Sequence, residues 1–121
     1  MRLSLLLLLG AVALAPVFSQ SDTTPMMSTV SPESGRIGDV LVVQGTNLGQ
    51  DLVAAVFLTD STGDTKVAII AQTSTSIRFK IPPEAKAGRY ALMVLTKGAN
   101  GRYFEEPVKL TVEPLPVRPE T

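Results

Sequence analysis

The side chains of this sequence that could perform chemistry are few and are not arranged to act together. The 121-residue chain has no histidine and no cysteine, which excludes imidazole acid–base catalysis, thiolate nucleophiles and thiolate metal sites. A serine nucleophile would need a lysine as its base, and no Ser-x-x-Lys sequence occurs. No Gly-x-Ser-x-Gly elbow, P-loop or dinucleotide-binding glycine pattern is present. We therefore predict a protein that is not an enzyme and that uses no cofactor.

Two pairs of carboxylates are the remaining candidates for a chemical role. Glu105 and Glu106 could form a glycosidase pair, but adjacent residues of a strand point to opposite faces. We expect both to be solvated side chains at the start of a strand. Asp60 and Asp64 flank a short run of hydroxyl side chains, as in a calcium loop, yet two carboxylates fall short of the six to eight oxygen ligands that calcium takes. No metal site is predicted.

The overall charge gives no reason to expect a nucleic acid or an anionic membrane as partner. The chain has 11 basic and 11 acidic residues. Removing a leader whose only charge is Arg2 leaves 10 against 11, a net charge of −1. A balanced surface of this kind lacks the basic field that such partners require.

The first 19 residues are typical of a signal peptide. Arg2 is followed by an apolar run over residues 3–15, and Val17 and Ser19 provide small residues for cleavage after Ser19. The alternative is a membrane anchor, but a spanning helix needs about 20 apolar residues and this run is shorter. Because there is no cysteine, a lipid anchor of the bacterial lipoprotein type is excluded. We expect a secreted or periplasmic protein.

The rest of the chain has the pattern of an all-β domain. Residues 20–25 form a flexible lead-in, residues 26–113 the domain, and residues 114–121 a proline-rich disordered tail whose Pro116-x-x-Pro119 is a spacer rather than a binding motif. Apolar stretches bounded by Gly, Pro, Asn or Asp recur every 8–12 residues. The expected strands cover residues 26–30, 39–44, 52–59, 65–72, 76–81, 89–96 and 107–112. About seven such strands predict an immunoglobulin-like β-sandwich.

Alternation within these strands predicts which side chains are buried, because successive side chains point to opposite faces. In residues 76–81 and 107–112 the expected inward residues are Ile77, Phe79, Ile81, Val108, Leu110 and Val112. Leu41 and Val43 share one face of residues 39–44, and Tyr90, Leu92 and Val94 share one face of residues 89–96, whereas the facing of residues 52–59 stays open. Residues 60–64 are predicted to form a hairpin loop with Gly63 in a left-handed conformation, and Asn100-Gly101 to mark a second hairpin. Tyr90 is placed where its hydroxyl could return to a nearby backbone group, as in a tyrosine corner.

Several short phrases resemble the IPT/TIG family of immunoglobulin-like domains, which occur in plexins, in some transcription factors and in many bacterial exported proteins. They are Val30-Ser31-Pro32 with Gly35, Gly45 with Asn47-Leu48, Ile81-Pro82, and Ala87-Gly88-Arg89-Tyr90, in the family's order over about residues 25–113. We expect structural roles for them: Gly45 for close backbone approach, Asn47 for satisfying backbone groups in a turn, and Leu48 for closing the end of the sandwich. The family supplies no catalytic residues.

One face of residues 89–96 is a candidate interaction surface. If Tyr90, Leu92 and Val94 point inward, then Ala91, Met93 and Leu95 point outward. Phe57 joins them from the neighbouring strand if Val56 and Leu58 are the inward pair there. The alternatives are that the lead-in or the tail covers this face, or that the assigned facing is inverted.

Two functions remain open at this point. The first is an exported, non-catalytic module for protein–protein interaction or for a structural role at the cell envelope or outside the cell, with a protein or a second copy as partner. The second is a carbohydrate-binding module, because the resembling family accompanies some starch-active enzymes. Sugar-binding surfaces usually need exposed aromatic rings, and this chain has no tryptophan.

Overall fold

The computed structural model describes residues 23–116, and within this range the chain is entirely β-structure. The predicted signal peptide, its cleavage site, residues 20–22 of the predicted lead-in and residues 117–121 of the predicted tail lie outside the described residues. The strands are β1 (Met26–Ser31), β2 (Ser34–Gly35), β3 (Val40–Thr46), β4 (Val53–Asp60), β5 (Gly63–Lys66), β6 (Ala68–Gln72), β7 (Ser76–Lys80), β8 (Gly88–Thr96) and β9 (Tyr103–Val112). No helix of a length and apolarity suited to a membrane occurs between residues 23 and 116.

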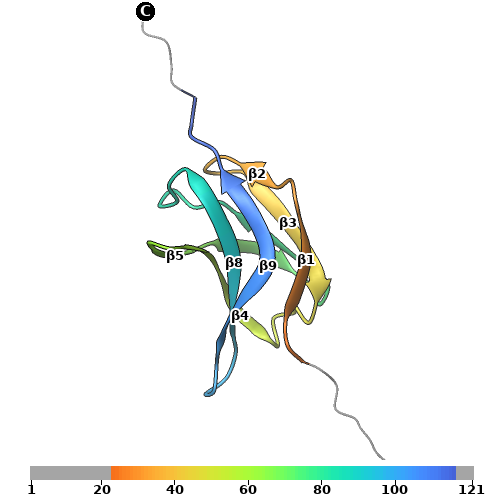
Figure 1. Cartoon of the computed structure of the whole chain (residues 1–121). Helices are drawn as coiled ribbons and strands as arrows, with labels where there is room; N and C mark the ends of the chain where they lie inside the picture. The colour runs from red at the N-terminus through yellow and green to blue at the C-terminus, as the bar shows by residue number, and fades with distance from the viewer. Residues whose placement is uncertain (1–22, 117–121) are drawn as a thin grey trace, which may run out of the picture.

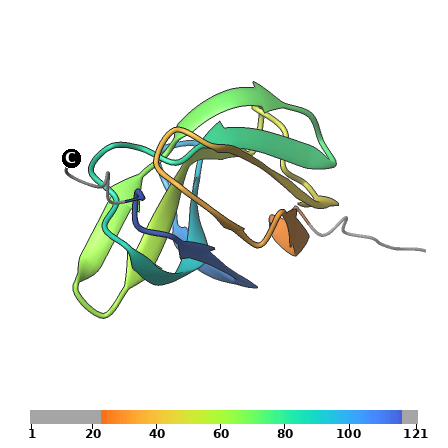
Figure 2. The same ribbon diagram turned by 90° about the horizontal axis from the view of Figure 1, so that it is seen from above.

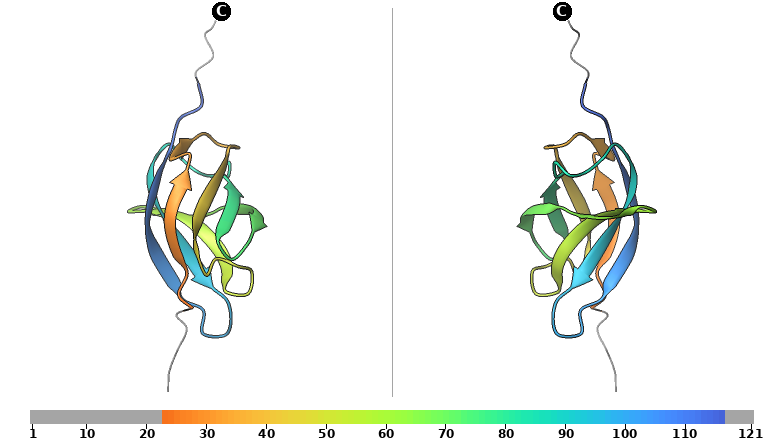
Figure 3. Two further views of the ribbon diagram at one scale, coloured as in Figure 1. Left: turned by 90° about the vertical axis from the view of Figure 1, so that its right-hand side faces the viewer. Right: turned by 90° about the vertical axis from the view of Figure 1, so that its left-hand side faces the viewer.

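Two sheets pack face to face as a β-sandwich (Figures 1 and 2). The four-stranded sheet has the order β1-β3-β7-β6, and the five-stranded sheet has the order β2-β9-β8-β4-β5. Every pairing is antiparallel except the short parallel contact of β2 with β9. The described chain begins at one end of the sandwich and leaves at the other (Figures 1 and 3). The predicted immunoglobulin-like sandwich is therefore the fold that is observed.

One of the seven expected strands is divided between the two sheets. Residues 65–72 were expected to form one strand, and this was wrong. Residues up to Lys66 pair with β4 in the five-stranded sheet, whereas β6 pairs with β7 in the other sheet. Val67 stands at the crossing, buried, and its N–H donates to Val56 O at 3.0 Å. An apolar run gives no sign of such a corner, because both sheets bury apolar side chains against the same core.

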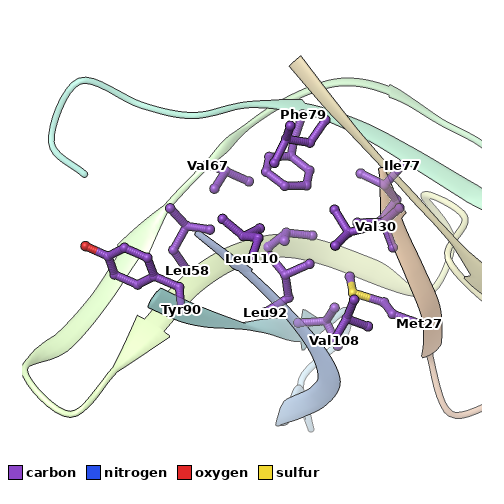
Figure 4. Packing of buried hydrophobic residues seen from close by; sticks show 14 of the residues in the cluster. Met27, Val30, Leu58, Val67, Ile77, Phe79, Tyr90, Leu92, Val108 and Leu110 are labelled. Carbon is purple, nitrogen blue, oxygen red and sulfur yellow. The ribbon is translucent and has the colours of Figure 1, made fainter. Parts of the chain in front are cut away.

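The alternation expected from the sequence is confirmed in the core. In β7, Ile77 and Phe79 are fully buried, and in β8 Leu92 and Val94 are as well. Figure 4 shows Ile77 and Phe79 of one sheet facing side chains of the other across the interior. The inward residues predicted above for residues 76–81 and 107–112, namely Ile77, Phe79, Ile81, Val108, Leu110 and Val112, are all buried. Where the sequence left the facing open, the buried residues are Leu41 with Val43, Val56 with Leu58, and Tyr90 with Leu92 and Val94.

Strand β9 starts four residues earlier than expected, at Tyr103 rather than Pro107. Its register against β8 runs from Ala91↔Lys109 directly to Met93↔Glu105, so residues 106–108 oppose a single residue of β8. Pro107 lies in this bulge, exposed, where its missing N–H removes no ladder hydrogen bond. Proline is therefore tolerated inside the strand, although the sequence pattern predicts a strand boundary at Pro107.

The turns and the tyrosine corner agree with expectation. Gly63 follows the tight β4–β5 turn with φ +146°, a value that favours glycine. The β8–β9 loop includes a turn closed by the N–H of Gly101 donating to Gly98 O at 3.1 Å. The Tyr90 hydroxyl donates to Lys86 O at 2.7 Å and accepts from the Lys86 N–H at 3.2 Å. Its ring closes one edge of the core with the hydroxyl pointing away from it (Figure 4).

The phrase Gly45–Leu48 acts structurally, as expected. A Cβ on Gly45 would overlap the carbonyl oxygen of Met26, so only glycine lets β1 lie this close. Asn47 adopts φ 59°, and its Nδ2 donates to Thr24 O at 3.0 Å, a backbone group 23 positions away that lies outside the turn for which this side chain was expected. Leu48 is fully buried.

Candidate interaction surface

The outer face of the five-stranded sheet brings the three predicted surface residues together. In the β4–β8 register Phe57 lies opposite Met93, and Ala55 lies opposite Leu95. Residues opposite each other in an antiparallel pair share a face, and Val56, Leu58 and Leu92 occupy the inner one. Phe57, Met93 and Leu95 therefore form a half-buried apolar patch that spans two strands.

Tyr103 extends this patch onto β9, and sequence reasoning missed it. It pairs with Leu95, is 60% exposed, and its ring centroid lies 5.8 Å from that of Phe57 at an interplanar angle of 57°. A tilted pair of this spacing is a favourable aromatic geometry. The signal was available in the alternation of Tyr103 and Glu105 ahead of Pro107, but the proline was interpreted as the start of the strand.

We call the set Ala55, Phe57, Met93, Leu95 and Tyr103 the apolar patch. Ala55 is the least exposed member of the patch, at 5%. Three adjacent strands contribute to it, so its side chains are held by a rigid sheet rather than by a loop.

Charged side chains stand on either side of the patch in two rows that follow the registers. One row is Lys66–Phe57–Met93–Glu105 across β5, β4, β8 and β9. The next row is Asp64–Thr59–Ala91–Lys109 across the same strands. All four charged residues are exposed. The Thr59 hydroxyl donates to Asp64 Oδ1 at 2.6 Å, and none of Lys66, Glu105 and Lys109 forms a salt bridge with another residue of the described range.

A shallow hollow of about 330 Å³ lies beside the patch, above the small side chain of Ala91. Its rim carries both signs of charge, because Asp60 and Glu105 are acidic whereas Arg89 and Lys109 are basic. The hollow is open, and its lining also includes the hydroxyl side chains of Thr59, Ser61 and Tyr90. Its chemistry suits polar and charged contacts.

Glu106 contradicts the expectation that both glutamates of the adjacent pair are solvated. Glu105 is exposed as expected, but Glu106 is 4% exposed and its Oε1 accepts the N–H of Met27 at 2.8 Å. Glu106 follows the outward-facing Glu105 and therefore points to the inner face of β9, where it meets the N–H of Met27 in β1 of the other sheet. Burial raises the pKa of Glu106, and the hydrogen bond from Met27 opposes that rise in part. The carboxylate joins the two sheets, and with Glu105 on the opposite face the pair cannot act as an acid and a base on one substrate.

The two aspartates of the β4–β5 hairpin each accept hydrogen bonds from a threonine of the same hairpin. Asp60 Oδ1 accepts both the N–H of Thr62 at 2.9 Å and its hydroxyl at 2.7 Å. These hydrogen bonds from Thr62 lower the pKa of Asp60. Asp64 is bonded to Thr59 instead, on the sheet face. Over residues 23–116 no three or more acidic side chains gather as a metal site.

Comparison with known proteins gives a family and several partial relatives. A family model described as the IPT/TIG domain matches residues 25–112. Cyclomaltodextrin glucanotransferases from Bacillus licheniformis and Niallia circulans are 32% identical over 101 residues, which is 84% of this chain but 14% of each enzyme. The chain thus spans about one seventh of the length of the curated relatives that it matches.

Among solved structures, the chain resembles the SGBP-B protein of the Bacteroides ovatus mixed-linkage glucan utilization locus, solved in complex with a mixed-linkage heptasaccharide. The TM-score is 0.51 with 21% sequence identity, and the match covers 85% of this chain and 24% of that one. This likeness concerns the fold.

Proposed function

This chain belongs to the IPT/TIG domain family, and on that premise we propose that it is a non-catalytic immunoglobulin-like module that binds a protein surface. The observation that carries the proposal is the apolar patch on the outer face of the five-stranded sheet. It combines two aromatic rings, a methionine and a leucine on three adjacent strands, with charged residues only at its margins.

This arrangement matches the anatomy of protein interfaces. Aromatic and methionine side chains are enriched at the centre of such interfaces, and charged side chains are found at the rim. Tyr103 and Phe57 each have few rotatable bonds, so ordering them on binding costs little conformational entropy. Their position on a sheet also keeps the geometry of the surface constant.

The absence of catalysis forms part of the proposal. The adjacent glutamates diverge, the hairpin aspartates accept hydrogen bonds within their own hairpin, and histidine and cysteine are missing from the whole sequence. The relatives that are enzymes match this chain over only 14% of their length. We therefore do not extend the glucanotransferase activity to this chain. We place its action outside the cytoplasm, on the strength of the signal-peptide pattern of residues 1–19.

The test is site-specific photocrosslinking in cells that produce the protein naturally. A photoreactive phenylalanine analogue at Met93 reports on the patch, and the same analogue at Arg78, at the centre of the outer face of the four-stranded sheet, is the control. We expect a discrete crosslinked protein band from position 93 and none from position 78. Equal labelling at both positions, or no band from position 93, would contradict the proposal.

Carbohydrate binding is the second candidate, and the exposed ring of Tyr103 is what favours it. The chain is similar to part of a cyclomaltodextrin glucanotransferase and, in fold, to part of a protein solved with a heptasaccharide. A single 60%-exposed tyrosine beside Phe57 offers one stacking surface for a sugar ring. Titration with maltoheptaose and with a mixed-linkage heptasaccharide, followed through the NMR signals of Tyr103, tests this candidate. Binding that is abolished by Tyr103→Ala supports it, and unchanged spectra at about 10 mM sugar, well above a ~1 mM dissociation constant, exclude it.

A further inference from the structure

We propose that the partner of the apolar patch is a second copy of this chain, related by a two-fold axis that runs parallel to the strands between β4 and β8. This inference rests on the proposed function, since it names the protein surface that the patch binds. It is carried by the arrangement of charges on the five-stranded sheet rather than by the apolar side chains alone.

The signs of the charges reverse from one row to the next. In the row through Phe57 and Met93, the basic Lys66 is on β5 and the acidic Glu105 is on β9. In the row through Thr59 and Ala91, the acidic Asp64 is on β5 and the basic Lys109 is on β9. Each row therefore carries opposite charges at its two ends.

A two-fold axis along the strands makes both rows self-complementary. Such an axis turns a second sheet over to face the first and exchanges its β5 side with its β9 side, while each row stays at its own height. Lys66 then faces Glu105 of the second copy, and Asp64 faces Lys109 of the second copy. An interface of this isologous kind is the commonest form of self-association, and each contact occurs twice.

The packing of apolar side chains favours this axis over the other axis in the plane of the interface, which runs across the strands. With the axis between β4 and β8, Phe57 of one copy lies over Met93 of the other, a favourable sulfur–aromatic contact. An axis across the strands would also bring unlike charges together, with Lys66 over Asp64. It would, however, place Phe57 over Thr59 and Met93 over Ala91, which buries less apolar surface. The strand-parallel axis satisfies the charges and the apolar patch together.

The lack of salt bridges to Lys66, Glu105 and Lys109 within the described part of one chain also supports a second copy as the partner. Lys66, Glu105 and Lys109 are exposed and form no salt bridge with any residue between 23 and 116. An unrelated partner would need matching charges of its own at all four corners, whereas a second copy supplies them by symmetry. Two aligned sheets in face-to-face packing are a common protein architecture.

The experiment measures the self-association of protein produced from the full 121-residue sequence, by sedimentation equilibrium over a concentration series. We expect a concentration-dependent dimer of the wild type. Lys66→Glu and Glu105→Lys each place like charges at both symmetry-related contacts and should raise the dissociation constant on the order of tenfold. Arg78→Glu, which makes a matching charge change on the other sheet, should leave it unchanged.

Mixing the two variants is the decisive measurement. In a 1:1 mixture, the glutamate introduced at position 66 of one variant faces the lysine introduced at position 105 of the other. The second contact of the pair joins the unchanged Lys66 and Glu105, so association should return to the wild-type value. With the axis across the strands, the mixture would stay as weak as its components, and that outcome overturns the proposed arrangement. Far-UV circular dichroism of each variant verifies that the fold is kept.

A wild-type chain that remains monomeric up to about 1 mM, a concentration at which contacts worth ~4 kcal/mol would be detected, overturns the second copy as partner. The proposed function is judged separately, because crosslinking at position 93 to a different protein would still support it. A crosslink from position 93 to another copy of this chain supports both.

Discussion

Replacing Gly45 by alanine is expected to detach the start of β1 from the sandwich. The added Cβ would overlap the carbonyl oxygen of Met26 and lie 2.9 Å from Met26 C and Met27 Cα. These are backbone atoms of the paired strand, so no side chain can rotate away. Ordinary carbon–carbon contacts are about 3.5–4 Å, and β1 must therefore move by roughly 1 Å.

The size of the effect follows from what β1 holds. Met27 is 1% exposed, and burial of such a side chain is worth about 1.5–3 kcal/mol. Its N–H donates to the Glu106 carboxyl group at 2.8 Å, and loss of this acceptor would leave a buried N–H unsatisfied at a cost of about 1–3 kcal/mol. Partial relaxation keeps some of both, so we expect Gly45→Ala to lower the free energy of unfolding by about 3 kcal/mol. That is a large part of the ~5–15 kcal/mol typical of a domain.

The assay is urea unfolding followed by circular dichroism and tyrosine fluorescence, with Gly38→Ala as the matched control. Gly38 has φ +92°, and a Cβ added there would have nothing within 4 Å, so alanine meets only the backbone cost of about 1–2 kcal/mol. Gly45 is the reverse case, with a steric clash and no positive φ. If Gly45→Ala proves no more destabilising than Gly38→Ala, close approach of β1 and β3 is refuted as the reason for glycine at this position.

Three further outcomes are expected. Tyr90→Phe removes the hydroxyl bonded to the Lys86 backbone and should cost about 1–2 kcal/mol in urea unfolding, whereas Tyr103→Phe, which removes an exposed hydroxyl, should cost under ~0.5 kcal/mol. Because burial raises the pKa of Glu106, the folded protein holds this proton more tightly than the unfolded chain, so its contribution to stability is full below the ordinary value of 4.5 and is lost as pH rises through the folded pKa. Glu106→Gln keeps an acceptor oxygen without the charge, so it should remove this decline and be at least as stable as the wild type at pH 7; a pH profile parallel to that of the wild type would argue against the assignment. Intact-mass measurement of exported protein should give a chain beginning at Gln20, and a mass that includes the leader would contradict the predicted cleavage.

Much of the fold could be predicted from local pattern because a strand has a period of two. Alternation was enough to place Ile77, Phe79, Ile81 and Leu110 in the core, and each is fully buried. The resemblance in short phrases added the family, and it also indicated that Gly45 has a backbone role. These features depend on near neighbours in sequence, so they are visible without coordinates.

The candidate surface was only half visible from the sequence. Phe57 and Met93 could be placed on one surface because the expected topology makes their strands adjacent. Tyr103 was missed because Pro107 was interpreted as the start of its strand, and the bulge that accommodates this proline exists only where β9 meets β8. The placement of opposite charges at the two ends of each row depends on the registers of three strand pairs, and a register cannot be inferred from a short stretch of sequence.

Local alternation and composition thus account for the strands, the buried faces and the lack of catalytic groups, since these depend on residue type and on spacing along one segment. The division of residues 65–72 between two sheets and the burial of Glu106 beside Met27 arose only in the folded chain. The physical reason is the same in both cases. An apolar run can be buried in either sheet, and a carboxylate can be buried wherever an N–H needs an acceptor, so contacts between residues as far as 79 positions apart decide the outcome.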